Sequence, residues 1–573
     1  MFKLLAYMKS YKKETVLGPL FKLLEALLEL LVPLVIAAVI DTGIAGGDRG
    51  YVVRMCLLLV GLGIVGLVFS ITAQYFAAKA SVGFVTKLRH ALFDHMQGLS
   101  YTELDTIGTS TLITRMTSDI NQVQSGINMT LRLLLRSPFV VFGAMIMAFT
   151  IDVKAALIFA AAIPVLSLVV FGIMLWCIPL YKRVQRKLDG VLSATRENLT
   201  GVRVIRAFCK EEEQISRFDD CNQDLTRTQK YVGRISALMN PVTYILINLA
   251  IIWLVYTGAL RVDAGLISQG AVVALYNYMS QILVELIKLA NLIINITKSV
   301  ACGNRIQSVF EIRSSLDAPE QAPAPKDFSY AVEFDHVTLR YANAGDDSLS
   351  DISFAARPGE TIGVIGSTGS GKSSLVNLIP RFYDASAGQV LVDGIHVKEY
   401  PLDDLRNRIG VVPQKAVLFK GTIRDNLRWG NPDATDAQLL EAVQTAQAGE
   451  VLAQKGGLDF ELEQGGKNLS GGQKQRFTIA RALVKHPKIL ILDDSASALD
   501  FATDAALRKA IREMPGNPTV FIVSQRTSSL QHADQILVLE DGAVVGAGTH
   551  AQLLESCPVY QEIYQSQFRK EDA

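Results

Sequence analysis

The sequence GSTGSGKSS, at Gly366–Ser374, decides how the rest of the chain is interpreted. The apolar stretch before it, Thr361–Ile365, predicts a strand, and the apolar stretch after it, Leu375–Ile379, predicts the start of a helix. Glycines at a sharp turn from strand to helix let backbone N–H groups converge on an anion, and the helix N-terminus adds partial positive charge. This context predicts a loop that binds the phosphates of a nucleotide.

Within this loop, Lys372 is expected to reach the outer phosphates, and the Ser373 hydroxyl is expected to complete the coordination shell of Mg²⁺. The alternative, a glycine-rich turn that matches the pattern by chance, is rare in a chain of this length. The candidate nucleotide contacts are the residues of the loop, namely Gly366, Ser367, Thr368, Gly369, Ser370, Gly371, Lys372, Ser373 and Ser374.

Length and composition limit the classes of protein to which the chain can belong. At 573 residues it is too long for one compact core, so at least two domains are expected. Half of the residues are hydrophobic and only 19% are charged, which indicates that part of the chain lies in a membrane. The formal net charge of +1 gives no support for nucleic-acid binding. The six cysteines lack paired spacing, so the sequence supports neither a disulfide framework nor a zinc site.

Six apolar segments are long enough to cross a bilayer of about 30 Å as helices of about 20 residues. Basic residues are dense after the second and fourth segments, whereas the other connections are short and poor in positive charge. Because positive charge favours the cytoplasmic side, both termini are expected in the cytoplasm. The segments are Val16–Ile40, Met55–Phe76, Leu131–Ile151, Ala155–Ile178, Ser236–Leu260 and Ala271–Ile294.

The remaining parts of this half are expected to lie at or beyond the membrane surface. Met1–Thr15 has basic and apolar residues but no cleavage site, so we expect an amphipathic surface helix and not a cleaved signal. The two basic connections are expected to be helical and to project roughly 35 to 40 Å into the cytosol. In the second, Glu197–Glu213 interrupts the helical pattern at Gly201, and it is either a solvated helix face or a segment docked on a neighbouring domain. Arg313–Tyr330, which contains three prolines, predicts a linker.

Further motifs follow this linker. VVPQ ends at Gln414, an apolar strand over Ile489–Leu492 precedes Asp493, and LSGGQ occupies Leu469–Gln473. The order of motifs over residues 341–550 resembles the nucleotide-binding domain of an ATP-binding cassette (ABC) transporter. Six spans with long cytoplasmic helices resemble the half-transporter of the exporter type, so the resemblance covers essentially the whole chain.

The resemblance implies a role for each motif. It implies that Tyr341 stacks on the adenine of ATP, that Gln414 contacts Mg²⁺ and the attacking water, and that Asp493 holds Mg²⁺ through water. It also implies that the loop Ser497–Asp500 connects the two sites of a dimer. The expected Mg²⁺ ligands are Ser373, Gln414 and Asp493. The signature, which binds the γ-phosphate of ATP on the opposite domain, comprises Leu469, Ser470, Gly471, Gly472 and Gln473.

Two positions depart from the family pattern. Where the family normally has a glutamate that orients the attacking water, this chain has Asp494, and where it has a histidine that contacts the γ-phosphate, this chain has Gln525. Aspartate is one methylene shorter, and a displacement of about 1 Å can cost about 10²-fold in rate. Glutamine carries no charge near neutral pH. The candidate catalytic residues are therefore Asp494, Gln525 and Gln414, in a site that binds ATP and hydrolyses it weakly.

This pattern resembles the degenerate half of a heterodimeric bacterial multidrug-type exporter, and neutral drift within a working ATPase is the alternative. The implied fold is a membrane α-helical bundle of six transmembrane helices, exporter-type and domain-swapped, followed by an α/β P-loop ABC domain. The expected domains are 1–312 (transmembrane, with an N-terminal elbow helix), 313–330 (linker) and 331–573 (nucleotide-binding). The expected partners are a second ABC half-transporter, an amphipathic small molecule such as a drug, lipid or peptide, and the lipid bilayer of a bacterial inner membrane.

Charged residues inside the spans are costly in a bilayer and indicate either function or pairing. Here they either line a cavity for amphipathic substrates or pair with one another. They are Lys22, Glu25 and Glu29 in the first span, Arg132 and Arg136 in the third, and Glu285 and Lys288 in the sixth. Two other functions stay open from the sequence, which are an exporter-fold importer of metal chelates and an ATP-gated regulatory or channel-like membrane protein.

Overall fold

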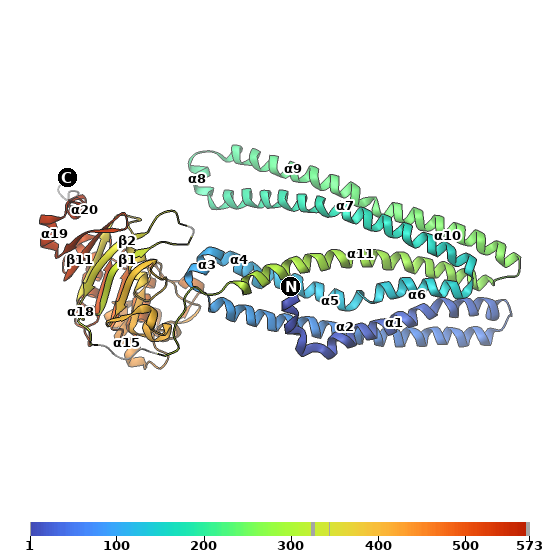
Figure 1. The fold of residues 1–573 in the computed structure, drawn as a ribbon, viewed down its shortest axis with the longest axis horizontal. Coiled ribbons are helices and arrows are strands. Elements are labelled where there is room, and N and C mark those ends of the chain that lie inside the picture. The colour runs from blue at the N-terminus through green and yellow to red at the C-terminus, as the bar shows by residue number, and fades with distance from the viewer. Residues whose placement is uncertain (1, 322–326, 343, 569–573) are drawn as a thin grey trace. The chain divides into compact units, whose positions relative to one another are not determined.

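The computed structural model describes residues 2–321, 327–342 and 344–568, and these form two compact units (Figure 1). The first unit comprises Ser110–Ile312 and the residues up to Gln97. The second comprises Gly98–Thr109 and the described residues from Arg313 onward. Residue 1 and residues 322–326 of the expected linker lie outside the described residues.

Long helices build the first unit (Figure 1). In the described part of the chain, six helical stretches are long and apolar enough to cross a membrane, and each contains one of the six predicted segments. The prediction of six spans is confirmed. The helices are α1 (Lys12–Ala38), α2 (Arg49–Gln97), α4 (Thr109–Thr114), α5 (Ile120–Leu133), α6 (Arg136–Ile151), α7 (Val153–Thr200), α8 (Val202–Ala207), α9 (Glu211–Ala237), α10 (Met239–Asp263) and α11 (Gln269–Glu311), with 3₁₀ segment η1 (Phe2–Tyr11) and π-helical segments η2 (Val39–Ile44) and η3 (Arg115–Asp119).

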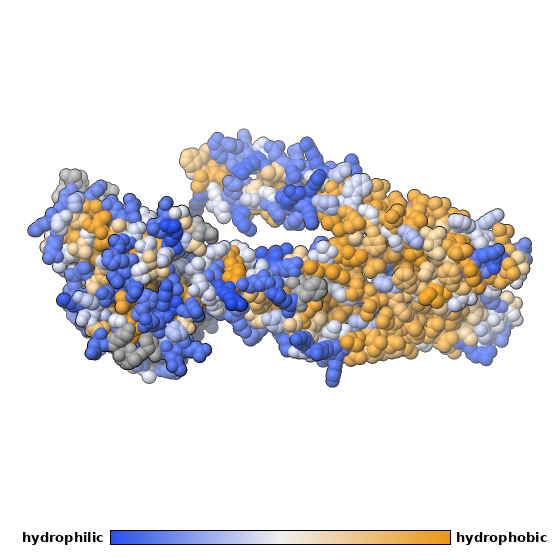
Figure 2. Space-filling model, in the orientation of Figure 1, coloured by the Kyte–Doolittle hydropathy of each residue, from blue (hydrophilic) through white to orange (hydrophobic). Residues whose placement is uncertain are grey.

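The surface of this unit agrees with a membrane environment. Figure 2 shows hydrophobic residues covering the part of the unit formed by α1, α2, α6 and α10, whereas the surface around α9 is largely hydrophilic. Leu57 and Val60 of α2 are 65% and 59% exposed. Apolar side chains exposed in such numbers fit a lipid-facing surface.

The N-terminal segment and the connection around Gly201 are both helical, with a break in each. The N-terminal segment is helical, but Phe2–Tyr11 is a 3₁₀ helix and α1 begins at Lys12, before the expected end at Thr15, because Tyr11 has a non-helical φ of −117°. The predicted interruption at Gly201 is confirmed, since α7 ends at Thr200 and α8 begins after this glycine.

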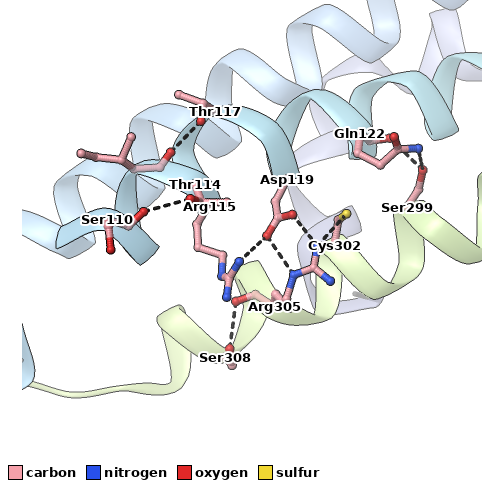
Figure 3. Close-up of polar contacts among 11 residues, drawn as sticks. Ser110, Thr114, Arg115, Thr117, Asp119, Gln122, Ser299, Cys302, Arg305 and Ser308 are labelled. Atoms are coloured by element: carbon pink, nitrogen blue, oxygen red, sulfur yellow. Dashed lines mark hydrogen bonds and ion pairs between the residues drawn. The ribbon is translucent and has the colours of Figure 1, made fainter. Parts of the chain in front are cut away.

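A buried carboxylate joins the last turns of α11 to the start of α5 (Figure 3). Asp119 is 3% exposed and accepts hydrogen bonds from the guanidinium of Arg305 at 3.0 and 2.5 Å and from Arg115 at 2.8 Å. The Sγ atom of Cys302 lies 3.1 Å from the same Arg305 guanidinium. These contacts fix the end of α11, which leads into the second unit, to the rest of the first.

The second unit contains an α/β core. In the described residues, a six-stranded sheet has the order β12-β11-β3-β10-β9-β6, in which only β12 is antiparallel to its neighbour, and a four-stranded antiparallel sheet has the order β2-β1-β4-β5. The strands are β1 (Val332–Leu339), β2 (Leu349–Ala356), β3 (Thr361–Gly366), β4 (Ala387–Val392), β5 (Ile395–His396), β6 (Ile409–Val412), β7 (Gly421–Thr422), β8 (Glu461–Leu462), β9 (Ile489–Asp493), β10 (Thr519–Val523), β11 (Gln535–Glu540) and β12 (Ala543–Gly548).

The central parallel strands are apolar along their length because both faces of the sheet are covered. Every residue of β9 and β10 is buried. The helices of this unit are α3 (Tyr101–Ile107), α12 (Lys372–Leu378), α13 (Leu402–Arg408), α14 (Ile423–Arg428), α15 (Asp436–Thr445), α16 (Gly449–Lys455), α17 (Gly471–Leu483), α18 (Phe501–Arg512), α19 (His550–Ser556) and α20 (Pro558–Phe568), with 3₁₀ turns η4 (Val397–Glu399), η5 (Gln464–Gly466) and η6 (Thr527–Ser529).

Helix α3 packs with this second unit although it lies between helices of the first in sequence. The ring of Tyr101 lies 4.8 Å from that of Phe382, centroid to centroid, and Tyr383 donates a hydrogen bond of 2.6 Å to Asp105. Aromatic contacts and one exposed hydrogen bond therefore attach this short helix to the α/β core.

Candidate functional site

The phosphate loop predicted at Gly366–Ser374 follows β3 and leads into α12. The helix begins at Lys372, three residues before the predicted start, because the left-handed backbone of Gly371 (φ 93°) ends the turn. A Cβ atom at Gly371 would lie 2.6 Å from the carbonyl oxygen of Ser348, so only glycine fits there. Gly369 also has a positive φ, of 89°.

Lys372 is held over this loop. Its Nζ donates to the carbonyl oxygens of Gly366 at 3.0 Å and Ser367 at 2.6 Å. Burial lowers the pKa of Lys372, and the nearby carboxylates of Asp494 and Asp493 oppose that shift. The ammonium group is thus only partly compensated by carbonyl dipoles, and an added anion would stabilise its charged form.

Asp493 ends β9 beside the loop. It is 8% exposed and accepts a hydrogen bond of 3.0 Å from the Ser373 hydroxyl. Burial raises the pKa of Asp493, and the charge of Asp494 adds to the shift, whereas the Ser373 hydrogen bond and Lys372 oppose it. A cation placed between the Asp493 carboxylate and the Ser373 hydroxyl would remove this cost, and oxygen ligands of this kind suit Mg²⁺.

Two further predicted residues contact each other beside the loop. Gln414, two residues beyond β6, donates a hydrogen bond of 3.2 Å to Asp494. Asp494 has a left-handed φ of 45°, and its N–H donates to the carbonyl oxygen of Val523 at 3.0 Å, which ties it to the end of β10. Gln525 follows the same strand and is exposed.

These residues line one cavity of about 240 Å³ at the carboxyl ends of β3, β6, β9 and β10. Parallel sheets commonly bind ligands at this edge, which explains how residues far apart in sequence come together. The lining comprises Ser348, Thr368, Gly369, Gly371, Lys372, Ser373, Ser374, Gln414, Asp493, Asp494, Val523, Ser524 and Gln525.

The donors of this cavity fit a polyphosphate. Among the described residues, no acceptor is present for the backbone N–H groups of Gly369, Gly371, Lys372 and Ser373. Backbone N–H groups without an acceptor, next to a cation, form an anion site. The Ser373–Asp493 pair adds oxygen ligands for a divalent cation. The arrangement therefore suits a nucleotide with Mg²⁺.

Tyr341 lies next to this cavity but lines a different one. Its hydroxyl donates a hydrogen bond of 2.9 Å to Ser374 of the loop, and its ring meets the Tyr383 ring edge-on at 5.0 Å. A cavity of about 530 Å³ is lined by Tyr341 and Tyr383 together with Asp105 of α3. The tyrosine expected to stack on adenine is thus connected both to the loop and, through Tyr383, to α3.

The LSGGQ residues do not line the phosphate cavity of this chain. Ser470 caps α17, and its side chain accepts a hydrogen bond from the N–H of Gln473. A Cβ atom at Gly472 would lie 2.8 Å from the carbonyl oxygen of Ala498, so the motif packs closely on the loop Ser497–Asp500. That loop is joined to the cavity, since the Ser497 hydroxyl donates to the Asp494 carbonyl at 2.8 Å.

In the first unit, most of the predicted intramembrane charges pair with one another. Arg136 donates to Glu285 and to Glu29, each at 2.6 Å, and Lys288 donates to Glu285 at 2.8 Å. Lys22 pairs with Glu25 at 2.5 Å. For Arg132, the buried Nε atom has no partner among the described residues. Pairing was one of the two readings that the sequence allowed.

A cavity of about 330 Å³ lies beside this network, between α1, α6 and α11. Glu29 and Lys288 line it with 44% and 43% of their side-chain surface exposed, whereas the side chains of Arg136 and Glu285 are 7% and 4% exposed. Apolar residues such as Val140 form other parts of the wall. Charged residues thus both pair and border an open space.

The sequence did not predict a role for three residues that make connecting contacts in the structure. Asp119 joins α5 to α11, Tyr383 joins Tyr341 to α3, and Gln567 of α20 contacts the segment around Gln525. For Asp119 there was a weak signal, because this aspartate precedes the apolar residues Ile120 and Val123. For the others no local pattern exists, because their partners are distant in sequence.

Comparisons with known proteins agree with this description. Residues 15–286 match the family model of the ABC transporter transmembrane region, and residues 349–497 match that of the ABC transporter. An uncharacterized ABC transporter ATP-binding protein of Mycobacterium tuberculosis is 37% identical over 98% of this chain and 97% of its own length. YfiB, an uncharacterized ABC transporter ATP-binding protein of Bacillus subtilis, is 36% identical over 100% of this chain and 99% of its own length.

Two other comparisons concern export. YgaD of Bacillus subtilis, provisionally named a multidrug export ATP-binding/permease protein, is 30% identical over 98% of each chain. The structure of a bacterial Atm1-family ABC exporter with ATP bound superposes with a TM-score of 0.79, covering 97% of this chain and 98% of that one at 23% identity. The last likeness establishes the exporter-type fold.

Proposed function

The chain belongs to the ABC transporter family, and we propose that it is the hydrolysis-impaired half of a heterodimeric exporter. In this proposal its own site binds ATP with Mg²⁺, and its signature motif completes a hydrolysing site on the partner. The transporter would lie in a bacterial inner membrane, and its nucleotide site and both termini would be in the cytoplasm. The transported molecule would be an amphipathic small molecule.

The observation that carries this proposal is the contrast between two groups of residues that line the 240 Å³ cavity. In the phosphate loop, the Lys372 ammonium and the Ser373 hydroxyl are the groups expected to contact phosphate and Mg²⁺, and both line this cavity. Among the residues expected to act on the attacking water and the γ-phosphate, Asp494 is hydrogen-bonded to Gln414, and Gln525 offers a neutral amide. In this proposal the groups that bind ATP are present, whereas the groups that act only in the transition state are shortened or uncharged.

Bound ATP and Mg²⁺ would supply the phosphoryl group and the charge that stabilises its transfer. The residues of this chain would bind and orient them: Lys372 would contact the outer phosphates, and Ser373 with Asp493 would hold the cation. Asp494 would orient the attacking water less well than a glutamate, since its carboxylate reaches about 1 Å less far. Gln525 could donate a hydrogen bond to the γ-phosphate but could not supply positive charge.

The position of the signature motif supports a dimer. Gly471 and its neighbours begin the 13-residue helix α17, whose N-terminus offers backbone N–H groups to an anion. They lie outside the phosphate cavity of their own chain. They would therefore act on a nucleotide held by a second domain, and ABC exporters of this architecture work as dimers in a bilayer.

The cavity beside Glu29 supports an amphipathic substrate. Its wall combines apolar residues with Glu29 and Lys288, whose charged ends remain partly exposed. We expect Glu29→Gln to reduce export of a cationic amphiphile at least threefold without loss of stability. Glu25→Gln is the matched control, because Glu25 pairs with Lys22 and does not line the cavity. Equal export by both variants would remove this assignment.

The main proposal is tested by restoring the two departures together. Asp494→Glu with Gln525→His should raise the steady-state ATPase rate of the assembled transporter, by about tenfold or more at this chain's own site. Adding Lys372→Ala to the same chain should abolish the gain, which would locate it at this site. An unchanged rate would contradict an impaired site.

Identification of the partner provides an independent test. The tagged chain, purified from its native membrane in mild detergent, should bring down an equal amount of a second half-transporter that carries the glutamate and histidine lacking here. Recovery only as a homodimer that does not hydrolyse ATP would instead support an ATP-gated switch, the function that the two departures also suit.

A further inference from the structure

The C-terminal helix contacts the segment that carries Gln525. We define the switch segment as Ser524–Thr527, which follows β10 and ends at the first residue of η6. The side-chain amide of Gln567, in α20, donates to the carbonyl oxygen of Gln525 at 2.7 Å. Its oxygen accepts from the N–H of Thr527 at 2.9 Å and from the Thr527 hydroxyl at 3.0 Å. One side chain thus satisfies polar groups on both sides of Arg526.

Helix α20, which carries Gln567, is packed against the core of the second unit. Tyr560 is fully buried in the core, and its hydroxyl lies 2.7 Å from Nδ1 of His550. Ile563 packs against the same core, and Gln561 donates to the carbonyl oxygen of Leu554 at 2.7 Å. Because the helix is anchored one and two turns before Gln567, its amide has a defined position relative to the sheet.

The switch segment contacts both the phosphate cavity and the loop Ser497–Asp500. Gln525 lines the phosphate cavity. Arg526 extends the other way, with its guanidinium donating to the carbonyl oxygens of Leu499 and Ser497 at 3.4 Å each and lying 4.9 Å from the centroid of the Phe501 ring. A shift of this segment would therefore move both the cavity wall and the loop beside the signature motif.

We propose that Gln567 is a positioning residue for Gln525, through which the C-terminal helix sets how well the site distinguishes ATP from ADP. The proposal rests on the proposed function, in which Gln525 faces the γ-phosphate. Thr527 is fully buried, so loss of its acceptor leaves a buried hydroxyl and N–H without a partner. The segment would then relax, and Gln525 would leave the position from which it contacts the γ-phosphate.

Only an amide can make this set of hydrogen bonds. Gln567 uses its NH₂ group on a carbonyl oxygen and its oxygen on two donors. A glutamate of the same shape keeps the acceptor but sets a carboxylate oxygen against the Gln525 carbonyl oxygen. Gln567→Glu therefore tests the hydrogen-bond pattern without removing volume, and Gln567→Ala tests removal of the side chain.

The test uses the full chain, purified with its associated half-transporter and placed in lipid nanodiscs. Photolabelling of this chain with an azido-ATP at low temperature, in competition with ATP and separately with ADP, gives its affinity for each nucleotide. We expect Gln567→Ala and Gln567→Glu to weaken ATP binding about fivefold to tenfold and to leave ADP binding within twofold. Gln561→Ala is the matched control, since this glutamine lies on the same helix but contacts Leu554.

The outcomes separate the possible roles. Equal weakening of ATP and ADP, or a lowered unfolding temperature that accounts for both, would show that Gln567 is merely structural and would overturn the proposal. Unchanged ATP affinity would overturn it as well. Because the readout is binding, it does not depend on hydrolysis: failure of Asp494→Glu with Gln525→His to raise ATPase activity would count against the impaired site and not against Gln567.

Discussion

Buried charges occur in both units, and their surroundings differ. In the first unit, Arg136 has two carboxylate partners, Glu285 and Glu29, each at 2.6 Å. In the second, Lys372 contacts the carbonyl oxygens of Gly366 and Ser367 and the hydroxyl of Ser370 but forms no ion pair within hydrogen-bond distance among the described residues, and burial lowers its pKa, while burial raises the pKa of Asp493. The first group is neutralised by the chain itself, whereas the second keeps charges that the chain alone does not favour.

This difference separates structural charges from ligand-binding ones. Breaking a buried ion pair destabilises the fold, because removal of one partner leaves the other charge buried and unpaired. A buried charge with a disfavoured ionised form costs stability until a ligand of opposite charge arrives. Substitution of a buried, paired charge such as Arg136 should therefore affect folding of the first unit, whereas substitution of Lys372 or Asp493 should affect nucleotide binding by the second.

The largest effect is expected for Arg136→Gln. Loss of this guanidinium leaves Glu29 without its partner and Glu285 with fewer donors, so the free energy of unfolding should fall by about 3–5 kcal/mol. Unfolding by sodium dodecyl sulfate in mixed micelles measures the change. Arg136→Gln combined with Glu285→Gln should recover part of the loss. A variant that unfolds normally but fails to transport would place Arg136 in the substrate path instead.

Next comes Lys372→Ala, which should weaken ATP binding about 100-fold, because two or more charge-assisted contacts to phosphate are lost. Stability should stay near that of the unchanged chain. Lys485→Ala is the matched control, since Lys485 is also half-buried and also donates to carbonyl oxygens, those of Arg406 and Ile409, away from the cavity. It should leave ATP affinity unchanged, as measured by nucleotide titration.

Sequence alone could predict the parts that depend on local pattern. The six spans follow from long apolar runs, and the phosphate loop from glycines between a strand and a helix. Asp493 could be placed because it ends an apolar strand, and the parallel sheet then brings it beside Ser373. Strand order and the carboxyl edge of a parallel sheet are general rules, so this much of the site is contained in the sequence.

Other features depend on packing across long sequence distances. Arg136 and Glu285 are 149 residues apart, and whether they line a cavity or pair depends on how α6 turns against α11. Gln567 lies 40 residues beyond Thr527 on a helix with no motif. A single side chain that contacts backbone atoms leaves no periodic signal, so these contacts could be found only in the structure.

A smaller effect is expected for Ser373→Ala. Loss of this hydroxyl removes one oxygen ligand and the hydrogen bond to Asp493, so about tenfold more Mg²⁺ should be needed for the same ATP binding. ATP affinity measured without Mg²⁺ should not change. Ser374→Ala is the control, since the hydroxyl of Ser374 accepts from Tyr341 and no contact joins it to Asp493. Equal Mg²⁺ dependence in both variants would remove Ser373 from the cation site.

The smallest effect is a gain in stability from Asp493→Asn. Because burial raises the pKa of Asp493, the folded chain binds its proton more tightly than the unfolded chain, and the ionised carboxylate lowers stability at neutral pH. Asparagine keeps the acceptor for Ser373 without the charge. The free energy of unfolding of the nucleotide-free second unit should rise by roughly 0.5–2 kcal/mol at pH 7.5.

The gain should shrink as the pH falls toward the pKa of Asp493, where the native residue takes up its proton. Mg²⁺-dependent ATP binding should be lost at either pH. Denaturant unfolding at pH 7.5 and pH 5.5 measures the gain in stability and its decrease with pH. A variant less stable than the native chain at pH 7.5 would mean that Asp493, like Arg136, is already neutralised by its neighbours, and the contrast between the two units would not hold.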